Sequence, residues 1–272
     1  MNSQPNINYD NPPVVEVAMG VQFTPPKGLS VAHIGSYWDT IRVIFGRCQE
    51  QPPLPHLVED LTLPKIASRP TLRFSGKPDM PRVWFLNDSG NQMVQVQRDR
   101  FVYNWRKMSP EETYPRYPKV KIQFAKYWAG FCEFLLSKNL PRPQVDQLEL
   151  VYVNHARQGE GWQSLADTQN LFTVFKCRTR SGFLPLPETL RWSMKYLLPD
   201  DQGRLHVDAM PVRIQEDNSL VMSLTLVVRG KPAGEITDAS ITNWFDVART
   251  WIVKGFADLA DEETDVLWGK QA

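Results

Sequence analysis

Two arrangements in this sequence place reactive side chains at a spacing that a known kind of site could use. His206 and Asp208 lie two positions apart, so on a strand both side chains would face one side and could begin a metal site. Cys48 follows Arg47, whose positive charge could lower the pKa of the thiol and favour a nucleophile. A single histidine–aspartate pair such as His206 and Asp208 is usually incidental on a strand, and no histidine or asparagine motif accompanies Cys48. We therefore predict no metal site, no cofactor and no catalytic nucleophile.

The short motifs that mark common catalytic sites are absent from the sequence. It contains no GxxxxGK[ST], GxGxxG, HExxH or GxSxG, which are typical of phosphate cradles, dinucleotide sites, zinc peptidases and hydrolases. The segment Pro199–Gly203, PDDQG, lacks the Asp/Asn spacing and the closing glutamate of a calcium loop, so it indicates a hairpin turn. We therefore expect the protein not to be an enzyme.

Aromatic and basic residues alternate in two stretches, NWRKMSPEETYPRYPK and RWSMKYLL. Proteins that bind single-stranded nucleic acid use this combination, but any strand with one buried face shows it too. The chain has 31 Lys and Arg against 30 Asp and Glu, a net charge of +1, whereas dedicated nucleic-acid binders usually have a clear basic excess. Nucleic acid thus stays as an alternative partner.

In the first half of the chain we expect strands and two helices, which would position the residues named above. Residues 12–23 are valine-rich and bounded by prolines, which predicts a strand, and a helix is expected after Ser30. A proline-rich, irregular connection follows, then the short strands TLRFSG, RVWFLNDSG and NQMVQVQRDRFVYNWRK. From Lys119 apolar residues recur at helical spacing, with Trp128 and Phe131 predicted to face the sheet.

The stretch around Arg98-Asp99 allows two interpretations. In one extended strand, Val94, Val96, Val102 and Asn104 would share a side. If Arg98-Asp99 forms a tight turn, the stretch is instead two strands.

The second half repeats the order of the elements without residue-by-residue identity. QVDQLELVYVNHA predicts a strand, GWQSLADTQNLF a loop and short helix, and three strands with Asp-, Asn- and Gly-rich turns follow. Residues 238–263 carry an apolar stripe typical of a long helix. We therefore predict an α+β protein of two tandem strand–helix–antiparallel meander–long helix units, at 1–142 and 143–272.

This element order is shared by TATA-binding-protein-like and helix-grip folds. Two such units usually merge their sheets or pack side by side about a pseudo-twofold axis, here as one compact body. A helix-grip unit can also enclose a small apolar ligand between its helix and its sheet. Three methionines of the second meander could line such a cavity or fill an ordinary core: Met194, Met210 and Met222.

Targeting and cysteine signals point to an ordinary cytoplasmic protein. The beginning of the sequence lacks a basic stretch followed by an apolar run, and no window approaches about 18 uninterrupted apolar residues, so we expect neither a signal peptide nor a membrane span. Cys48, Cys132 and Cys177 are odd in number and far apart, which argues against a disulfide framework. We expect these thiols to be buried.

Several stretches together resemble one bacterial family. They are NPPVVEVAMGVQF, VQVQRDRFVYNWRK with YPRYPKV after it, QLELVYVNHA, and LWG near the end, from Asn11 to Gly269. They resemble a sporadically distributed family of uncharacterised bacterial proteins of about this length, often found in variable gene neighbourhoods. The most specific part is the DRFxxNWR…YPRY run. The resemblance implies no catalytic residues.

The resemblance also singles out polar and aromatic residues that core packing alone would not require. One hypothesis is a buried polar network, in which Glu16 or Glu149 pairs with Arg100, Arg106 or Arg116. The other is a recognition surface anchored by arginines and tyrosines. The candidate residues are Glu16, Gln97, Asp99, Arg100, Asn104, Trp105, Arg106, Tyr114, Arg116, Tyr117, Glu149, Tyr152 and Asn154.

These observations favour a non-enzymatic binding or adaptor protein that acts through protein–protein contact. The scattered distribution implied by the resemblance suits a role accessory to a mobile or defence-associated gene system. We expect a protein partner, with nucleic-acid binding on a fused sheet surface or a small apolar ligand as the alternatives. The sequence leaves the partner's identity and the oligomeric state open.

Overall fold

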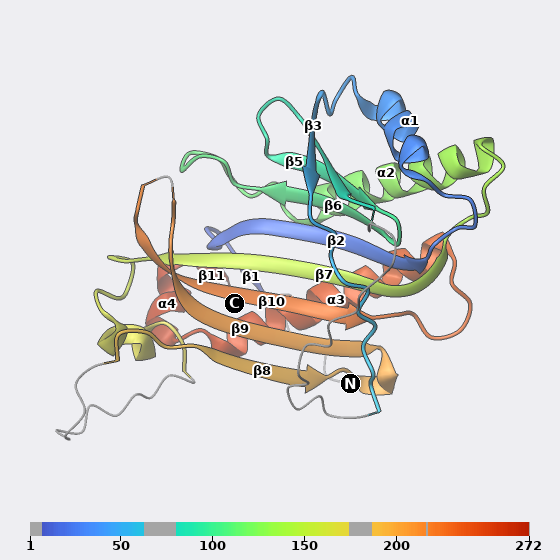
Figure 1. Ribbon diagram of the computed structural model, residues 1–272. Helices are drawn as coiled ribbons and strands as arrows, with labels where there is room; N and C mark the ends of the chain where they lie inside the picture. Colours follow the sequence, from blue (N-terminus) through green and yellow to red (C-terminus); the bar gives the residue numbers. More distant parts are fainter. Residues whose placement is uncertain (1–6, 63–79, 174–186, 216, 272) are drawn as a thin grey trace.

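One large antiparallel sheet organises the protein in the computed structural model, which describes residues 7–62, 80–173, 187–215 and 217–271. The sheet has nine strands, and neighbouring strands pair antiparallel throughout. The chain is therefore α+β, as predicted. In spatial order (Figure 1) the strands are β3 (Arg47–Gln51), β4 (Arg82–Leu86), β5 (Gln92–Gln97), β6 (Arg100–Arg106), β2 (Val14–Thr24), β7 (Gln144–Arg157), β10 (Leu220–Gly230), β9 (Gly203–Arg213) and β8 (Trp192–Leu197).

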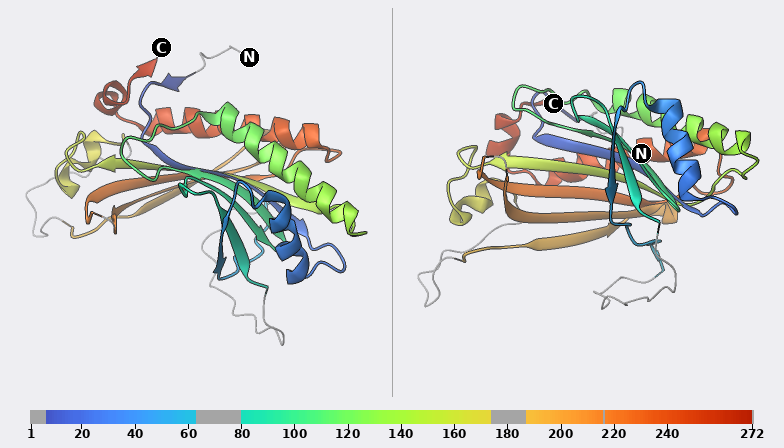
Figure 2. Two further views of the ribbon diagram at one scale, coloured as in Figure 1. Left: turned by 90° about the horizontal axis from the view of Figure 1, so that it is seen from above. Right: turned by 45° about the horizontal axis from the view of Figure 1, so that its top comes forward.

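Two long helices, α2 (Tyr117–Ser137) and α3 (Asp238–Leu259), cover one face of this sheet (Figure 2). The predicted stripe on α2 is confirmed, because Val120, Phe124, Trp128 and Phe131 are all buried. Phe124 of α2 meets Phe245 of α3 edge to face at 4.8 Å, so the two helices share one aromatic core.

Smaller elements complete the chain. The helix α1 (Val31–Ile41) packs beside α2 through Tyr37, whose ring lies 5.1 Å from that of Phe131. A 3₁₀ helix, Leu165–Asn170, stands where the second half was expected to have a short helix. A short helix α4 (Glu262–Leu267) follows α3, and the two-stranded sheet of β1 (Asn8–Tyr9) and β11 (Lys270–Gln271) joins the two ends of the described chain.

The Arg98-Asp99 pair forms the tight turn, so the two-strand interpretation is confirmed. Gln97 at the end of β5 pairs with Arg100 at the start of β6. Val94 and Val96 consequently lie opposite Tyr103 and Phe101 and face the helices, while side chains such as Val102 and Asn104 face the other side. The predicted strand TLRFSG lies outside the described residues.

The central pair of the sheet consists of β2 and β7, the first long strand of each half. Val17 pairs with Tyr152 and Met19 with Leu150 along this seam. On one side of the seam β2 has β6 as its other neighbour, and on the other side β7 has β10. The seam thus places the last meander strand of each half beside the first strand of that half.

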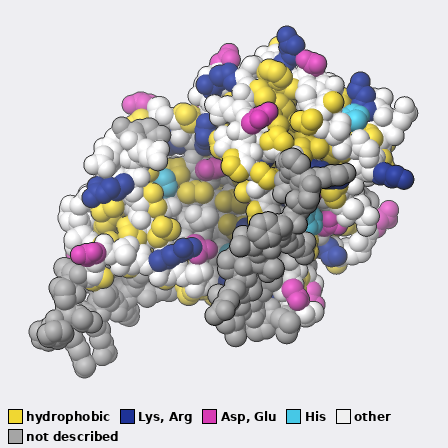
Figure 3. Space-filling model, in the orientation of Figure 1, with side chains coloured by type: hydrophobic (Ala, Val, Ile, Leu, Met, Phe, Trp, Pro, Cys, Tyr) yellow, Lys and Arg dark blue, Asp and Glu magenta, His cyan; other side chains and the backbone are white. Residues whose placement is uncertain are grey.

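The sheet bends so that its face away from the helices is concave (Figure 2). Figure 3 views this face and shows a hollow with hydrophobic side chains at its bottom and charged ones around it. Part of the face is crossed by the proline-rich segment of residues 52–60, which follows β3 (Figure 1). We call this segment the strap.

Glutamine side chains on the concave face hold the backbone of the strap. Gln97 accepts from the N–H of Leu54 at 2.8 Å and donates to its carbonyl at 2.7 Å. Gln22 makes the same two contacts with Leu57, at 3.2 and 3.0 Å. Because the strap pairs with no strand in the described part of the chain, these amides satisfy backbone groups that a sheet would otherwise satisfy.

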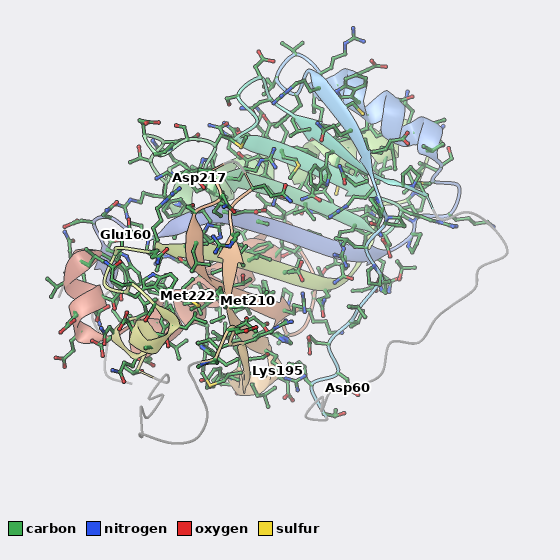
Figure 4. The ribbon with its side chains drawn as sticks, turned by 60° about the vertical axis from the view of Figure 1, so that its left-hand side comes forward. Asp60, Glu160, Lys195, Met210, Asp217 and Met222 are labelled. Carbon is green, nitrogen blue, oxygen red and sulfur yellow. The ribbon has the colours of Figure 1, made fainter. Side chains whose placement is uncertain are left out.

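One expectation about side chains is wrong, and one of two alternatives is not favoured. Cys48 is exposed on the outermost strand β3, whereas Cys132 on α2 is buried as expected; Cys177 lies outside the described residues. The methionines of the second meander do not converge on one cavity, because Met222 is fully buried and Met210, on the neighbouring strand, is 40% exposed (Figure 4). Alternation along paired strands sends these two side chains to opposite faces.

Candidate functional site

The candidate residues divide between the two faces of the sheet. Five of them line a single cavity on the helix side: Tyr114, Arg116, Tyr117, Tyr152 and Asn154. Trp105 lies next to this cavity, with its ring 5.4 Å from that of Tyr114. The other candidates, Glu16, Gln97, Asp99, Arg100, Asn104, Arg106 and Glu149, belong to the concave side or its rim. The candidate residues named from the resemblance therefore form two separate clusters, one on each face of the sheet.

The cavity has a volume of about 530 Å³ and lies where four parts of the chain meet. The beginning of α2 supplies Tyr117, α3 supplies Arg249, β7 supplies Tyr152, and β1 with the end of the chain closes the fourth side. Its apolar wall includes Ile252 and Phe256 from α3. We call it the Tyr–Arg pocket.

Two tyrosine hydroxyls meet in this pocket. The hydroxyl oxygens of Tyr114 and Tyr152 lie 2.9 Å apart, and either can be the donor. Burial raises the pKa of Tyr152 to about 12, and burial together with the Tyr152 hydroxyl raises the pKa of Tyr114, against the opposing charges of Arg249 and Arg116. Both phenols are therefore protonated at neutral pH. Since one proton serves their mutual hydrogen bond, the pair has a second proton to donate.

Arg116 stands at the mouth of the pocket in an unusual backbone conformation. Its φ is 72° and its ψ 148°, a region that residues other than glycine rarely adopt. Its guanidinium donates from Nη1 to the carbonyl of Tyr9 at 2.7 Å and from Nη2 to that of Asp10 at 2.8 Å. Arg116 thus ties the loop before α2 to the N-terminal strand, and is not the partner of a buried carboxylate.

Arg249 is the pocket residue that the sequence analysis missed. Its guanidinium lies 5.7 Å from the centre of the Tyr117 ring, and its Nε is buried without a hydrogen-bond partner in the described part of the chain. Tyr117 in turn donates to Asp246, which also pairs with Lys121 at 2.8 Å. Asp246 is therefore occupied by other groups. The only sequence signal was an arginine within the apolar stripe of a helix.

The charge of the pocket follows from its lining. Arg116 and Arg249 both contribute to it, and no aspartate or glutamate is among the described residues that line it. An unpaired buried cation is unfavourable unless an anion or hydrogen-bond acceptor reaches it. The pocket is therefore suited to an anionic group.

The concave-face candidates are engaged in contacts within the protein. Glu149 forms an ion pair with Arg229, and not with an arginine of the candidate set. Glu16 accepts from Nδ2 of Asn104 at 2.5 Å. Burial raises the pKa of Glu16, while that hydrogen bond and the charge of Arg106 oppose the rise. The two glutamates thus have polar partners, Asn104 and Arg229, that differ from the arginines named in the hypothesis of a polar network.

Other concave-face candidates hold the strap or a turn. Asp99 lies 2.9 Å from Nδ1 of the strap residue His56, and Nη2 of Arg100 donates to the carbonyl of Pro55 at 3.1 Å. Nε of Arg106 donates to the carbonyl of Gly90 at 2.9 Å. These side chains thus hold segments of backbone beside them.

A buried charge cluster fastens the end of the strap. Oε2 of Glu59 lies 2.9 Å from Nη1 of Arg204, and its Oε1 lies 2.8 Å from Nε2 of His206. Nη1 of Arg204 also donates to the carbonyl of Asp60, which is labelled in Figure 4. His206 therefore faces Glu59, whereas Asp208 faces Arg191 at 3.6 Å. In the described residues no group of three His, Cys, Asp or Glu side chains could hold a metal ion.

Cys48 lacks the environment of an activated thiol. Partial burial and the charge of Glu50 raise its pKa. Arg47 is directed elsewhere, because its Nε and Nη2 donate to the carbonyl of Asn87. The suggestion that Arg47 activates Cys48 is therefore wrong.

A second cavity, of about 670 Å³, lies at the opposite end of the seam between β2 and β7. Its lining mixes His56, Arg142 and Lys231 with Asp146, and Arg142 already pairs with Asp238. The Tyr–Arg pocket differs in having an arginine that no described residue neutralises.

In the described part of the chain, no helix is long and apolar enough to span a membrane. The chain matches no protein-family model, no curated protein and no solved structure.

Proposed function

We propose that this protein is a non-enzymatic binding protein that recognises a protein partner by taking part of that partner into the Tyr–Arg pocket. The observation that carries the proposal is Arg249, a partly buried arginine above the ring of Tyr117 without an ion pair in the described residues. Arginine and tyrosine are the residue types that most often anchor protein interfaces.

The strained backbone of Arg116 supports the same location. A non-glycine residue in its conformation costs on the order of 1–3 kcal/mol, and such residues cluster at functional sites. Its two hydrogen bonds to the N-terminal strand fix one wall of the pocket. Tertiary contacts thus fix this wall of the pocket.

A protein partner is favoured over nucleic acid by how the cations are distributed. On the concave face Arg229 pairs with Glu149, and Arg204 with Glu59, so these charges are already neutralised. Binding to a phosphate backbone relies on cations that release counterions from phosphates. Arg100 and Arg106 of that face are held by backbone carbonyls. Arg249, which has no ion pair in the described residues, lies instead in a compact, partly apolar cavity, which fits one side chain or chain end better than a nucleic-acid strand.

Site-specific cross-linking in the host cell tests the proposal. A photoreactive benzophenone side chain replaces Val253, which lines the pocket, and in a matched control it replaces Ile122, an exposed residue of α2. We expect a discrete cross-linked protein at position 253 that disappears when Arg249→Gln is added. That protein, once identified and purified, should bind the wild-type chain directly. Equal labelling at positions 253 and 122, in a variant that melts like wild type, would contradict the proposal.

We also propose that residues 1–142 and 143–272 are two related units that meet at the seam between β2 and β7. The support is topological: in each half the first strand neighbours the last meander strand, and a long helix follows that strand. The antiparallel pairing of β2 with β7 is the arrangement that a twofold relation between the units would require.

A further inference from the structure

We infer that the group taken into the Tyr–Arg pocket is a carboxylate carried on an apolar body. This inference rests on the proposed function, because it names the chemistry that the same pocket selects. It follows from three features of the described lining: the unpaired guanidinium of Arg249, the spare proton of the Tyr114–Tyr152 pair, and the apolar wall contributed by α3.

The guanidinium of Arg249 provides the charge and the shape. Arginine presents its donors as a planar fork that matches the two oxygens of a carboxylate. The Nε of Arg249 is one of these donors, and it is buried without an acceptor in the described residues. A carboxylate that approached from the pocket would supply that acceptor and neutralise the charge.

The two phenols provide a neutral donor beside this charge. Their oxygens are 2.9 Å apart, and because both are protonated, one proton remains after their own hydrogen bond is made. Asn154, which also lines the pocket, uses one of its two Nδ2 hydrogens for the carbonyl of Leu224 at 3.1 Å. Because a phenol is a stronger hydrogen-bond donor than an amide, the spare phenolic proton is the donor best suited to a second ligand oxygen.

The number of free donors favours a carboxylate over a phosphate. Arg116 lines the same pocket and keeps its positive charge, but its Nη1 and Nη2 each already donate to a backbone carbonyl. A phosphate dianion has more acceptor oxygens than the Nε of Arg249 and one phenolic hydroxyl can satisfy, and burying unsatisfied polar atoms beside apolar walls is costly. The two oxygens of a carboxylate match these two donors.

The apolar wall defines the rest of the ligand. Val14, Ile252, Val253 and Phe256 line the pocket together with proline and tyrosine rings. A cavity of about 530 Å³ exceeds what a bare carboxylate would fill, and apolar surface there is stabilised by burying apolar ligand surface. The ligand is therefore an apolar residue or chain that ends in, or carries, a carboxylate.

The probe pair 3-phenylpropionate and 3-phenylpropionamide tests this chemistry, because the two differ in charge but hardly in shape. Binding to the full chain is measured by ligand-observed NMR and calorimetry. We expect the acid to bind about tenfold or more tightly than the amide, since a hydrogen bond to a charged group contributes about 1.5–3 kcal/mol. Arg249→Gln should remove this preference and leave the weak binding of the amide unchanged.

Two further variants serve as controls. Arg249→Lys keeps the charge but loses the planar fork, and should give an intermediate preference for the acid. Arg42→Gln removes an exposed arginine of another region and should leave the preference as in wild type. Equal affinity for acid and amide, or a preference that survives Arg249→Gln in a folded protein, would overturn the inference.

Peptide probes distinguish the sources of the carboxylate. A short peptide that ends in phenylalanine is compared in its free-acid and C-terminally amidated forms, and with an amidated peptide that carries an internal glutamate. If only the free-acid peptide binds tightly, the carboxylate comes from the C-terminus of a chain. If the glutamate peptide binds tightly, the carboxylate comes from an acidic side chain. If the acid probe binds but position 253 cross-links no protein, the carboxylate inference stands and the protein-partner proposal falls. If cross-linking succeeds while the probe acids and amides bind alike, the inference falls and the proposal stands.

Discussion

The hydroxyl oxygens of Tyr114 and Tyr152 lie 2.9 Å apart, and this contact joins the loop before α2 to the middle of β7. The loop reaches the strand on the helix side of the sheet, where Trp105 packs against the same ring of Tyr114. One hydrogen bond thus connects the first half of the chain to the second beside the Tyr–Arg pocket.

Alkaline pH should destabilise the protein through these two phenols. Burial raises the pKa of Tyr152 to about 12 and also raises that of Tyr114, so the folded state keeps protons that the unfolded state releases near pH 10. The free energy of unfolding should therefore be unaffected below pH 10 and should fall as the pH rises from 10 to about 12. Denaturant melts across this range measure the fall. Tyr152→Phe should make it shallower, whereas the exposed Tyr196→Phe should not.

Replacing Trp128 by alanine should strongly destabilise the protein. Its side chain is 2% exposed and packs against Phe23 and Phe101, so truncation opens a large cavity in the core. We expect a loss of about 3–5 kcal/mol in the free energy of unfolding. Ile122→Ala on the same helix is the control, because Ile122 is 64% exposed and should change stability by less than about 0.5 kcal/mol. Similar thermal melts for the two variants would show that α2 does not pack as described.

Arg116 allows backbone strain to be separated from side-chain contacts. Arg116→Ala and Arg116→Gly both remove the bonds to the carbonyls of Tyr9 and Asp10, but only glycine accepts a φ of 72° without strain. We expect the glycine variant to be more stable than the alanine variant, by about 1 kcal/mol. Thermal and urea melts of the pair measure the difference, and a more stable alanine variant would disprove the strain.

The buried charge of Glu59 should be essential for the strap. Glu59→Gln leaves Arg204 and His206 without their carboxylate, and breaking a buried pair in this way typically costs about 3–5 kcal/mol. Hydrogen exchange should then rise first at Leu54, Leu57 and Glu59, whose N–H groups the glutamines hold. An exposed pair gives the control: Asp39→Asn removes the partner of Arg42 and should change stability by less than about 1 kcal/mol. Unchanged exchange in the strap of Glu59→Gln would contradict this role.

Elements with strong local patterns could be predicted from the sequence. The apolar stripe on α2 predicted both the helix and its buried face, because the spacing of Phe124, Trp128 and Phe131 leaves little choice. The turn at Arg98-Asp99 could not be decided, since it contains neither glycine nor asparagine to mark it. The strap was expected only as an irregular connection, because its position depends on glutamine side chains from distant strands.

The site was predictable only in part. Tyr114, Arg116, Tyr117, Tyr152 and Asn154 were named in advance, but nothing local indicated that they share a pocket while Glu16 and Glu149 lie on the other face. Arg249 was missed because an arginine in a helix is ordinary. Its place in the pocket, over the ring of Tyr117 and without an ion pair in the described residues, depends on how α3 meets α2 and β7.

The seam between β2 and β7 has a consequence for how fast the chain can fold. Val14 pairs with Asn154 and Thr24 with Gln144, so every contact of the seam closes a very long loop of chain. The entropy of loop closure must be overcome before these contacts stabilise anything, and sheets rich in such distant pairings fold slowly. Hairpins such as β5–β6 close short loops and can form early, but until the seam joins, β2 and β7 each present an unpaired apolar edge. We therefore expect the newly made chain to be most prone to aggregation before the seam has formed.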